Sequence, residues 1–259
     1  LKLTSEQTAK ILKTVKEAFL NIFFPKKCVY CGKILGYKSN LSLCLQCAEK
    51  CMTREKPLRD FETKYFDSVL CASYYEKHMR NAILNFKFHA VTYLAPTFAH
   101  ILLLKLKEDF RFAYADIITC VPLGRARLAK RGYNQSELVA REASKSLSGE
   151  FISNLLFKVK DVPPLSKMTA AKRRRAVKNA YKFNNNFDIR GKTVLLIDDI
   201  FTTGATVNEC ARILKLNGAK SVFAMCVCET RQKGLFENDL HKENFDERKN
   251  LYNSDKRRV

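Results

Sequence analysis

The residues best placed to do chemistry lie in the segment VLLIDDIFTTGAT, residues 194–206. Its apolar run predicts a buried parallel strand, and the run ends on Asp198 and Asp199, whose like charges repel each other. The segment then turns through threonines and a glycine toward a predicted helix. Open α/β sheets bind ligands at the carboxyl ends of their strands, and a helix N-terminus binds anions. Both features suit a ligand with hydroxyl groups and a phosphate, such as a ribose phosphate.

Each carboxylate of the pair can accept a hydrogen bond from one of two vicinal hydroxyls, and a Mg²⁺ ion held by the ligand would temper their repulsion. Gly204 lets the backbone approach a phosphate, while Thr202, Thr203 and Thr206 add hydroxyl donors. No Gly-Lys-Ser/Thr is present, so this is not a P-loop. The alternative interpretation is structural, a polar strand end that caps a helix, with Asp198 in a salt bridge.

Four cysteines form a second group with ligand spacing. Cys28-x-x-Cys31 and Cys44-x-x-Cys47 are separated by twelve residues, and each pair can place two thiolates on one turn. Two such turns give the closed tetrahedral site of a structural Zn²⁺, with no coordination position left for catalysis. Redox-active or simply buried cysteines are the alternative. Cys51 has no assigned role. The other five are expected to pack in the core, namely Cys71, Cys120, Cys210, Cys226 and Cys228.

Positive charge is concentrated in one part of the chain. The formal net charge is +21, and residues 158–182 hold nine lysines and arginines against one aspartate. Residues 231–259 hold eight against six. Charge that served solubility alone would be spread more evenly, so this concentration favours a polyanionic partner, either nucleic acid or a phosphorylated ligand.

Strands and helices are predicted to alternate from Ser68 onward. Strands are expected at residues 68–75, 117–121, 193–197 and 221–228. Helices are expected at residues 1–24, 78–88, 95–109 and 136–147, and through 207–214 to a stop at Gly218. Strands that alternate with helices form a parallel sheet covered on both faces, so the predicted fold class is α/β.

The chain is expected to divide into four regions. Residues 1–25 are an amphipathic helical arm, 26–56 the four-cysteine module, 57–230 the α/β domain and 231–259 a polar tail. The module lacks a core of its own, so the metal would supply much of its stability. No apolar run reaches the roughly 18 residues that span a bilayer, and lysines interrupt the first region throughout, unlike a signal peptide. These features predict a cytoplasmic protein with no transmembrane segment.

The segment 194–206 resembles the 5-phosphoribosyl-1-pyrophosphate (PRPP) signature of type I phosphoribosyltransferases over thirteen consecutive residues. In that family the two acidic residues contact the ribose hydroxyls, and the loop that follows holds the 5′-phosphate. The resemblance implies that Asp198 and Asp199 bind the ribose of PRPP, which is held with Mg²⁺. It implies a 5′-phosphate site made by Thr202, Thr203, Gly204, Ala205 and Thr206.

The larger pattern resembles the competence protein F (ComF) family from about Phe24 to Cys228. The resemblance is carried by the four-cysteine ribbon and by the segments VPLGRARLAKRGYNQSELVA (121–140) and VPPLSKMTAAKRRRAVKNAYKF (162–183). The implied fold is that of a type I phosphoribosyltransferase, with a parallel sheet and a small amino-terminal zinc-ribbon module.

The ComF resemblance also implies roles for basic segments. It implies a place on the pyrophosphate side of PRPP for Val121, Pro122, Arg131 and Lys87, and Arg125 is a further candidate because it follows the predicted strand end at Val121. A solvated helix face is the alternative for Arg125. A mobile basic loop over the site, or a contact with DNA, is implied for Lys172, Arg173, Arg174 and Arg175. This chain departs from the family's usual glutamine, leucine and asparagine at Leu165, Met168 and Ala176, which removes hydrogen bonds that could orient a ligand or acceptor.

Three functions are compatible with these residues. The first is a cytoplasmic competence factor for DNA uptake in natural transformation, which binds single-stranded DNA and retains a PRPP site, with DNA-uptake machinery proteins as partners. Tyr133 and Tyr181 could then stack on bases, with core packing as the alternative. The second is an active phosphoribosyltransferase of nucleotide salvage or biosynthesis, which transfers phosphoribose to a base or amine. The third is a regulator that binds PRPP without turnover. No residue is identified as a general base, so catalysis is left open.

Overall fold

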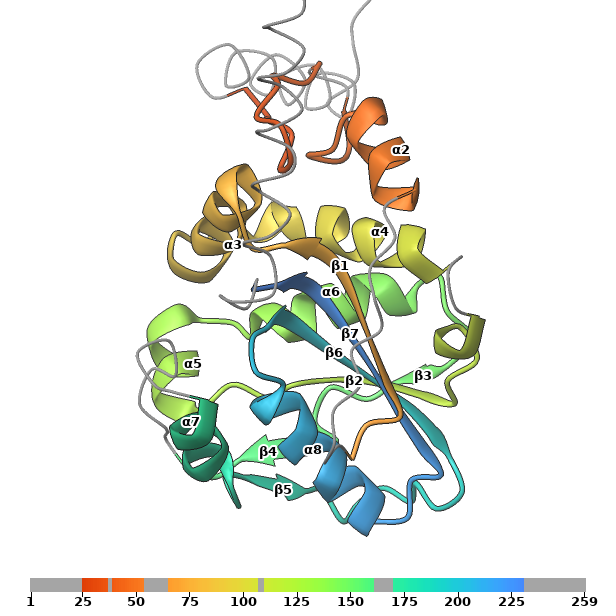
Figure 1. The fold of residues 1–259 in the computed structure, drawn as a ribbon. Helices are drawn as coiled ribbons and strands as arrows, with labels where there is room; N and C mark the ends of the chain where they lie inside the picture. The colour runs from red at the N-terminus through yellow and green to blue at the C-terminus, as the bar shows by residue number, and fades with distance from the viewer. Residues whose placement is uncertain (1–24, 37–38, 54–64, 107–109, 161–169, 231–259) are drawn as a thin grey trace, which may run out of the picture. The chain divides into compact units, whose positions relative to one another are not determined.

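The computed structural model describes residues 25–36, 39–53, 65–106, 110–160 and 170–230 (Figure 1). The chain divides into two compact units, Leu1–Glu229 and Thr230–Val259, and all the helices and strands described below belong to the first. The predicted arm, apart from Pro25, and the predicted tail lie outside the described residues. Among the helices that are described, none is long and apolar enough to cross a membrane.

A five-stranded sheet runs through this unit in the order β1-β7-β6-β2-β3, and every neighbouring pair is parallel (Figure 1). The strands are β1 (Ser68–Tyr74), β2 (Ile117–Cys120), β3 (Glu150–Phe151), β6 (Thr193–Phe201) and β7 (Ser221–Glu229). Strands β6 and β7 are buried over nearly their whole length, as strands covered on both faces must be. The predicted parallel-sheet α/β fold is confirmed.

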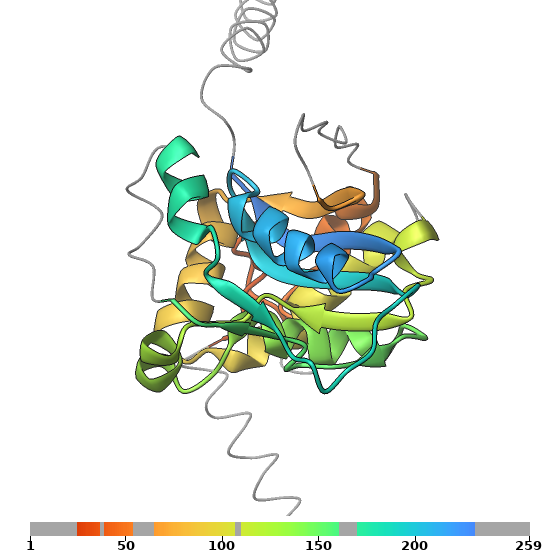
Figure 2. The same cartoon turned by 90° about the horizontal axis from the view of Figure 1, so that it is seen from below.

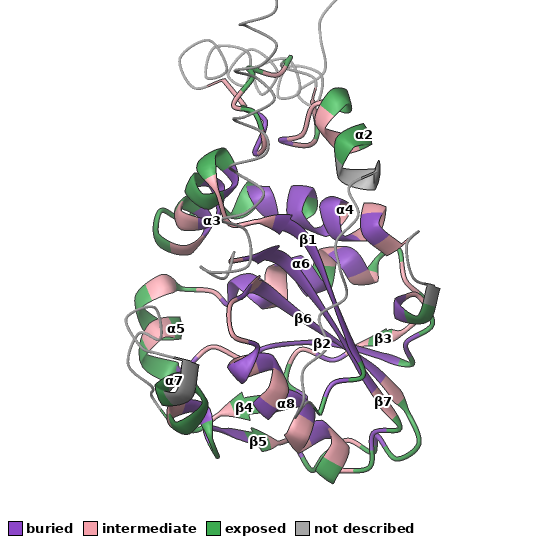
Figure 3. Ribbon diagram, in the orientation of Figure 1, coloured by how far each residue is buried: buried purple, intermediate pink, exposed green. Residues whose placement is uncertain are grey.

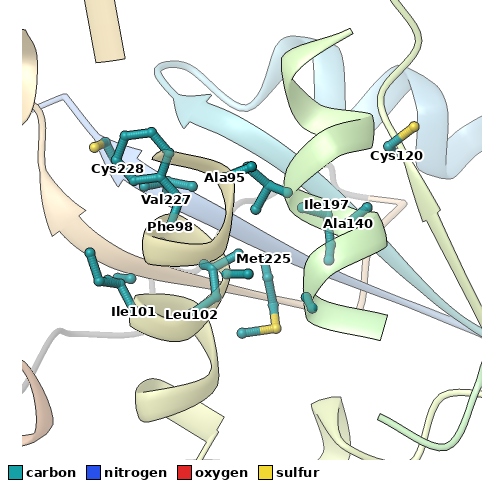
Figure 4. Packing of buried hydrophobic residues seen from close by; sticks show 14 of the residues in the cluster. Ala95, Phe98, Ile101, Leu102, Cys120, Ala140, Ile197, Met225, Val227 and Cys228 are labelled. Carbon is teal, nitrogen blue, oxygen red and sulfur yellow. The ribbon is translucent and has the colours of Figure 1, made fainter. Parts of the chain in front are cut away.

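Helices pack on one face of the sheet. They are α3 (Lys77–Phe88), α4 (Ala95–Lys105) and α6 (Gln135–Ser144). Their apolar side chains form one core cluster with alternate residues of the strands, such as Leu195 and Ile197. Figure 4 shows Phe98 and Leu102 of α4 beside Met225 and Val227 of β7.

The opposite face is covered by one helix and a small hairpin, which Figure 2 shows from below. These are α8 (Ala205–Leu216) and the antiparallel strands β4 (Leu156–Lys158) and β5 (Tyr181–Phe183). They form a second core cluster with the other set of strand residues, including Val194 and Leu196. All five cysteines expected in the core are buried. The two clusters hold β6 rigidly between them, and β6 carries the acidic pair.

Strand β6 is longer than its sequence pattern predicts. It was expected to end at residue 197, but its pairing with β7 continues to Phe201, so Asp198 and Asp199 lie inside the strand. The pairing of β2 with β6 ends at Ile197, because the β2 chain turns away toward Pro122. From Asp198 onward β6 therefore has no β2 partner among the described residues, and the acidic pair lies past the last β2–β6 pair.

Shorter elements connect these layers. Between β2 and α6 lies an additional helix, α5 (Arg125–Arg131), which has no buried residue and ends at Gly132 with φ 83°. It was absent from the expected helices, since RARLAKR has no apolar face, but it agrees with the solvated helix face given as the alternative for Arg125. The remaining helices are α2 (Leu45–Thr53), α7 (Ala170–Val177) and the 3-10 turns Thr92–Leu94 and Phe110–Phe112.

The four-cysteine module shares the core of the α/β domain. Val29 is 4% exposed and belongs to the first core cluster, together with residues of α3 and α4. The backbone N–H of Ser42 donates to Thr97 Oγ1 of α4 at 2.9 Å, and the bond is buried. The module therefore has a packing partner even though it lacks a core of its own, and its loss would expose part of the larger core.

Candidate functional site

Asp198 and Asp199 contact different neighbours, Ser136 of α6 and Lys87 of α3. The Ser136 hydroxyl, in the first turn of α6, donates to Asp198 Oδ1 at 2.9 Å, and the backbone N–H of Asp199 donates to the same oxygen at 2.9 Å. The Lys87 ammonium, in the last turn of α3, lies 2.8 Å from Asp199 Oδ2. That oxygen nevertheless accepts no hydrogen bond from the described residues, so the contact is an ion pair without hydrogen-bond geometry.

Burial changes the acidity of this pair. Asp198 is 7% exposed and Asp199 is 4% exposed. Burial, and then repulsion from the Asp199 carboxylate, raises the pKa of Asp198 from its ordinary value of 3.8 to about 7, although Lys87 and the two hydrogen bonds act in the opposite direction. The cost of holding two carboxylates here falls when hydroxyl donors or a cation approach them, so the pair favours such a ligand.

The turn after β6 forms a small hollow at the N-terminus of α8. It is lined by Asp198, Ile200 and residues 201–207. Thr203 Oγ1 is buried in this turn and has no hydrogen-bond partner among the described residues. Helix α8 begins without a side-chain cap, so its first N–H groups remain available to an anion. An unsatisfied hydroxyl beside an uncapped helix of twelve residues is suited to a phosphate group.

Gly204 is required by both conformation and space. Its φ is +72°, and a Cβ added there would lie 2.8 Å from Phe201 Cζ. We expect Gly204→Ala to destabilise the protein by roughly 1–3 kcal/mol, because a left-handed φ and a steric clash add together. Gly191→Ala is the matched control, since Gly191 has φ +73° but open space around it. Urea denaturation of both variants measures the difference, and equal losses would show that the approach of the Phe201 ring does not matter.

The turn after β2 is held by α6. Asn134 caps α6 by accepting from the Ser136 N–H, and its side-chain amide donates to the Val121 carbonyl at 3.0 Å. Arg131 is half-buried, donates to Gln135 Oε1 and lies over the Phe88 ring. Arg125, by contrast, is exposed on α5. The structure thus brings Lys87 and Ser136 to the acidic pair but leaves Arg125 outside the hollow.

The basic segment lies only partly within the described residues. Lys172, Arg174 and Arg175 are exposed on α7, whereas Leu165, Met168 and the side chain of Arg173 lie outside the description. Ala176 is half-buried against the second core cluster.

The two tyrosines considered for base stacking pack against the protein. Tyr181 is 3% exposed in the second core cluster, and Tyr133 donates its hydroxyl to the Phe86 carbonyl and lies against the Phe86 ring. These contacts favour core packing over base stacking for both tyrosines.

Ser136 was missed by sequence reasoning, although its contact with Asp198 is a central one. It directly follows RGYNQ, and a hydroxyl residue in the first turn of the helix after that segment was the available signal.

The four predicted zinc ligands lie together. The Sγ atoms of Cys28, Cys31, Cys44 and Cys47 lie within 4.8 Å of one another. In a tetrahedral site with Zn–S bonds of about 2.3 Å the sulfurs are about 3.8 Å apart, and Cys31 Sγ lies 3.8 Å from Cys44 Sγ. Burial disfavours the Cys28 thiolate, but backbone N–H groups of Cys44, Cys31 and Tyr30 lower the pKa of Cys28 to about 7, whereas burial and the neighbouring thiols raise the pKa of Cys47. The cluster is therefore able to hold a metal ion.

Comparison with known proteins agrees with this geometry. The family model described as phosphoribosyl transferase domain matches residues 90–251. The DNA utilization protein YhgH of Escherichia coli O157:H7 is 26% identical over 78% of this chain and 90% of its own length. Competence protein F of Haemophilus influenzae is 28% identical over 75% of this chain and 81% of its own length. Competence protein ComFC of Streptococcus pneumoniae is 32% identical over 57% of this chain and 62% of its own length.

These relatives confirm the resemblance to the competence protein F family that the sequence motifs indicated. Because the family model covers more than half of the chain, including the acidic pair and the turn that follows it, this protein belongs to the phosphoribosyl transferase domain family.

Proposed function

We propose that this protein is a competence factor of the ComF kind, which binds single-stranded DNA in the cytoplasm and carries a PRPP–Mg²⁺ site. The observation that carries the PRPP assignment is the placement of two buried carboxylates beside an uncapped helix whose turn holds an unsatisfied Thr203 hydroxyl. The two carboxylates suit hydroxyl groups, and the uncapped helix with its Thr203 hydroxyl suits a phosphate. The relatives named for competence and DNA utilization support the biological setting.

In the proposed complex, Asp198 and Asp199 accept hydrogen bonds from the two ribose hydroxyls of PRPP. The turn at residues 202–206 donates backbone N–H and hydroxyl groups to the 5′-phosphate. Lys87 already lies at the acidic pair, and we assign it to balance the charge there and to contact the pyrophosphate side of the ligand. We assign Val121, Pro122 and Arg131 to the same side of the ligand. The hydrogen bond from the Asn134 amide to the Val121 carbonyl holds the turn after β2 in place there.

The residues present fit a Mg²⁺ ion that arrives with PRPP. Carboxylate oxygens are the ligands that Mg²⁺ prefers, and the acidic pair offers two buried carboxylates, of which Asp199 Oδ2 is paired with the Lys87 ammonium at 2.8 Å. When bound, the ion neutralises pyrophosphate charge. The chain's own contribution is to orient the ribose and the phosphate from two rigid elements, β6 and α8.

DNA binding is assigned to the exposed basic surface that includes α7. Lys172, Arg174 and Arg175 are exposed on this helix, and we include Arg173 from its place in the same run. Cationic side chains track a phosphate backbone without reading its sequence.

A salt titration with a labelled single-stranded oligonucleotide tests the DNA assignment. We expect the logarithm of the binding constant to fall linearly with the logarithm of salt concentration, and the double change Arg174→Gln with Arg175→Gln to reduce that slope by about 1.4, or about 0.7 per lost phosphate contact. Arg190→Gln is the control, because Arg190 is also exposed but is held by Asp188 at 2.7 Å. Absence of binding even at low salt would remove DNA from the proposal and leave the PRPP site standing.

The alternative function is an active phosphoribosyltransferase, which the family match favours. An amine or a base nitrogen would attack C1 of the ribose as pyrophosphate leaves, and the cations on the pyrophosphate side would stabilise the departing charge. Release of pyrophosphate from PRPP in the presence of one member of a panel of bases and amines would establish this function. PRPP binding without turnover would favour a competence factor or a PRPP sensor.

We further propose that the module at residues 26–56 holds a structural Zn²⁺, and that residues 57–230 form the phosphoribosyltransferase-like domain, between an arm at 1–25 and a tail at 231–259. Proteins of the DNA-uptake machinery are the proposed partners in the cytoplasm.

A further inference from the structure

A second cleft lies away from the acidic pair. Its volume is about 550 Å³, and it is bounded by the turn after β2, by α5, by the first turn of α6 and by β4. It shares no lining residue with the hollow at the N-terminus of α8. The lining residues used below are Arg125, Leu128, Glu137, Phe157, Lys158 and Val159.

The cleft is lined by unusually exposed apolar side chains. Phe157 is 45% exposed, Val159 is 48% exposed and Leu128 is 41% exposed. The exposure of Phe157 follows from the hairpin register, because Phe157 pairs with Lys182 on the outer face, while Leu156 and Tyr181 point to the core. Figure 3 shows this exposure on β4 and on α5. An exposed aromatic ring that lines a cleft and is carried on a paired strand offers a surface for stacking.

The charges around this ring favour a polyanion. Arg125 and Lys158 line the cleft, and Lys182 is exposed beside Phe157 across the hairpin. Glu137 also lines the cleft, but Arg141 lies 2.8 Å from its carboxylate and balances its charge. An aromatic side chain with cations near it is the combination that binds single-stranded nucleic acid, since every base has a stacking face and every nucleotide a phosphate.

We infer that this cleft binds a nucleotide of single-stranded DNA, with its base stacked on Phe157 and its phosphates beside Lys182 and Arg125. The inference rests on the proposed function and names the place where the DNA is held. It adds an aromatic contact that the basic run on α7 cannot supply. Because Arg125 also follows the turn after β2, the DNA would lie next to the pyrophosphate side of the PRPP site.

The test is fluorescence titration of an oligonucleotide of about 12 nucleotides that contains 2-aminopurine. We expect wild-type protein to quench the fluorescence by stacking. Phe157→Ala should bind roughly 5- to 100-fold more weakly and lose the quenching, while Phe157→Tyr should retain both. Tyr114→Ala is the matched control and should behave as wild type, because Tyr114 is 77% exposed but precedes the opposite, amino end of β2.

Calorimetry with PRPP and Mg²⁺ on the same variants separates the assignment of the DNA cleft from the assignment of the PRPP site. Phe157 does not line the hollow at α8, so Phe157→Ala should bind PRPP as wild type does, which also shows that it is folded. Lys182→Gln should reduce the salt slope by about 0.7. If wild-type protein binds the oligonucleotide and Phe157→Ala binds it equally well, the cleft assignment is wrong while DNA binding stands. If wild-type protein does not bind it at all, the DNA part of the proposed function fails as well.

Discussion

Replacing Asp198 by asparagine is expected to stabilise the protein against unfolding at pH 8 by roughly 1–3 kcal/mol. The two side chains have nearly the same shape, and the amide oxygen of the introduced asparagine can still accept from Ser136. What changes is that a buried negative charge, which the Asp199 carboxylate repels, is removed. Under the proposed function the variant would lose PRPP binding as it gains stability, because Asp198 is assigned to the ribose hydroxyls.

The gain in stability from Asp198→Asn should depend on pH. In the folded protein Asp198 keeps its proton up to about pH 7, while in the unfolded chain it loses the proton near its ordinary value of 3.8. Between these values the folded state binds more protons, so wild-type stability falls as the pH rises and the full cost is present above about pH 7. The advantage of Asp198→Asn should therefore be small at about pH 4, grow over this window and level off above it.

Urea denaturation at pH 5 and pH 8 measures this difference. Asp188→Asn is the matched control, because Asp188 is exposed and Arg190 lowers its pKa to about 2, so its replacement should give no gain in stability. A variant Asp198→Asn that is less stable than wild type at pH 8 would show that the carboxylate is a structural ion-pair member.

If the module holds the proposed Zn²⁺, Cys28→Ser should release it and destabilise the protein by at least about 4 kcal/mol, because loss of a structural metal is among the most destabilising single changes. The loss extends beyond the module, because Val29 follows Cys28 directly and is packed in the core with α3 and α4. The buried bond from Ser42 to Thr97 would be lost with it.

Elemental analysis of protein purified without chelator, combined with denaturation, measures both effects. Cys120→Ala is the control, since Cys120 is buried in the sheet outside the cluster and its replacement should keep the metal. Wild-type protein that carries no metal, or a Cys28→Ser variant as stable as wild type, would contradict the zinc assignment.

Much of the fold could be predicted because its signals are local. The apolar runs at 194–197 and 222–228 require burial on both faces, and their alternation with helical patterns leaves a parallel sheet as the simple solution. The four cysteines were predictable for the same reason, since each pair is one turn of chain. The acidic pair was expected after the strand but lies within it, because the end of β6 is set by pairing with β7 rather than by its own residues.

The contacts that complete the site could not be predicted, because they join residues far apart in the chain. Lys87 reaches Asp199 from α3, and Ser136 reaches Asp198 from α6, and no local pattern specifies either meeting. The exposure of Phe157 depends on a hairpin partner, Lys182, which is 25 residues further along the chain. The sequence could show that positive charge is concentrated, but only the register of the β4–β5 hairpin shows which lysine lies beside an aromatic ring.

The central claim is that the acidic pair and the turn after it bind PRPP with Mg²⁺, and isothermal titration calorimetry tests it most directly. Wild-type protein should bind one PRPP in the presence of Mg²⁺, and should bind it more tightly at pH 8 than at pH 6, because Asp198 ionises over that range. The double variant Asp198→Asn with Asp199→Asn, shown to be folded by denaturation, should give no binding heat at either pH. Equal affinity of the double variant and the wild type would contradict the assignment.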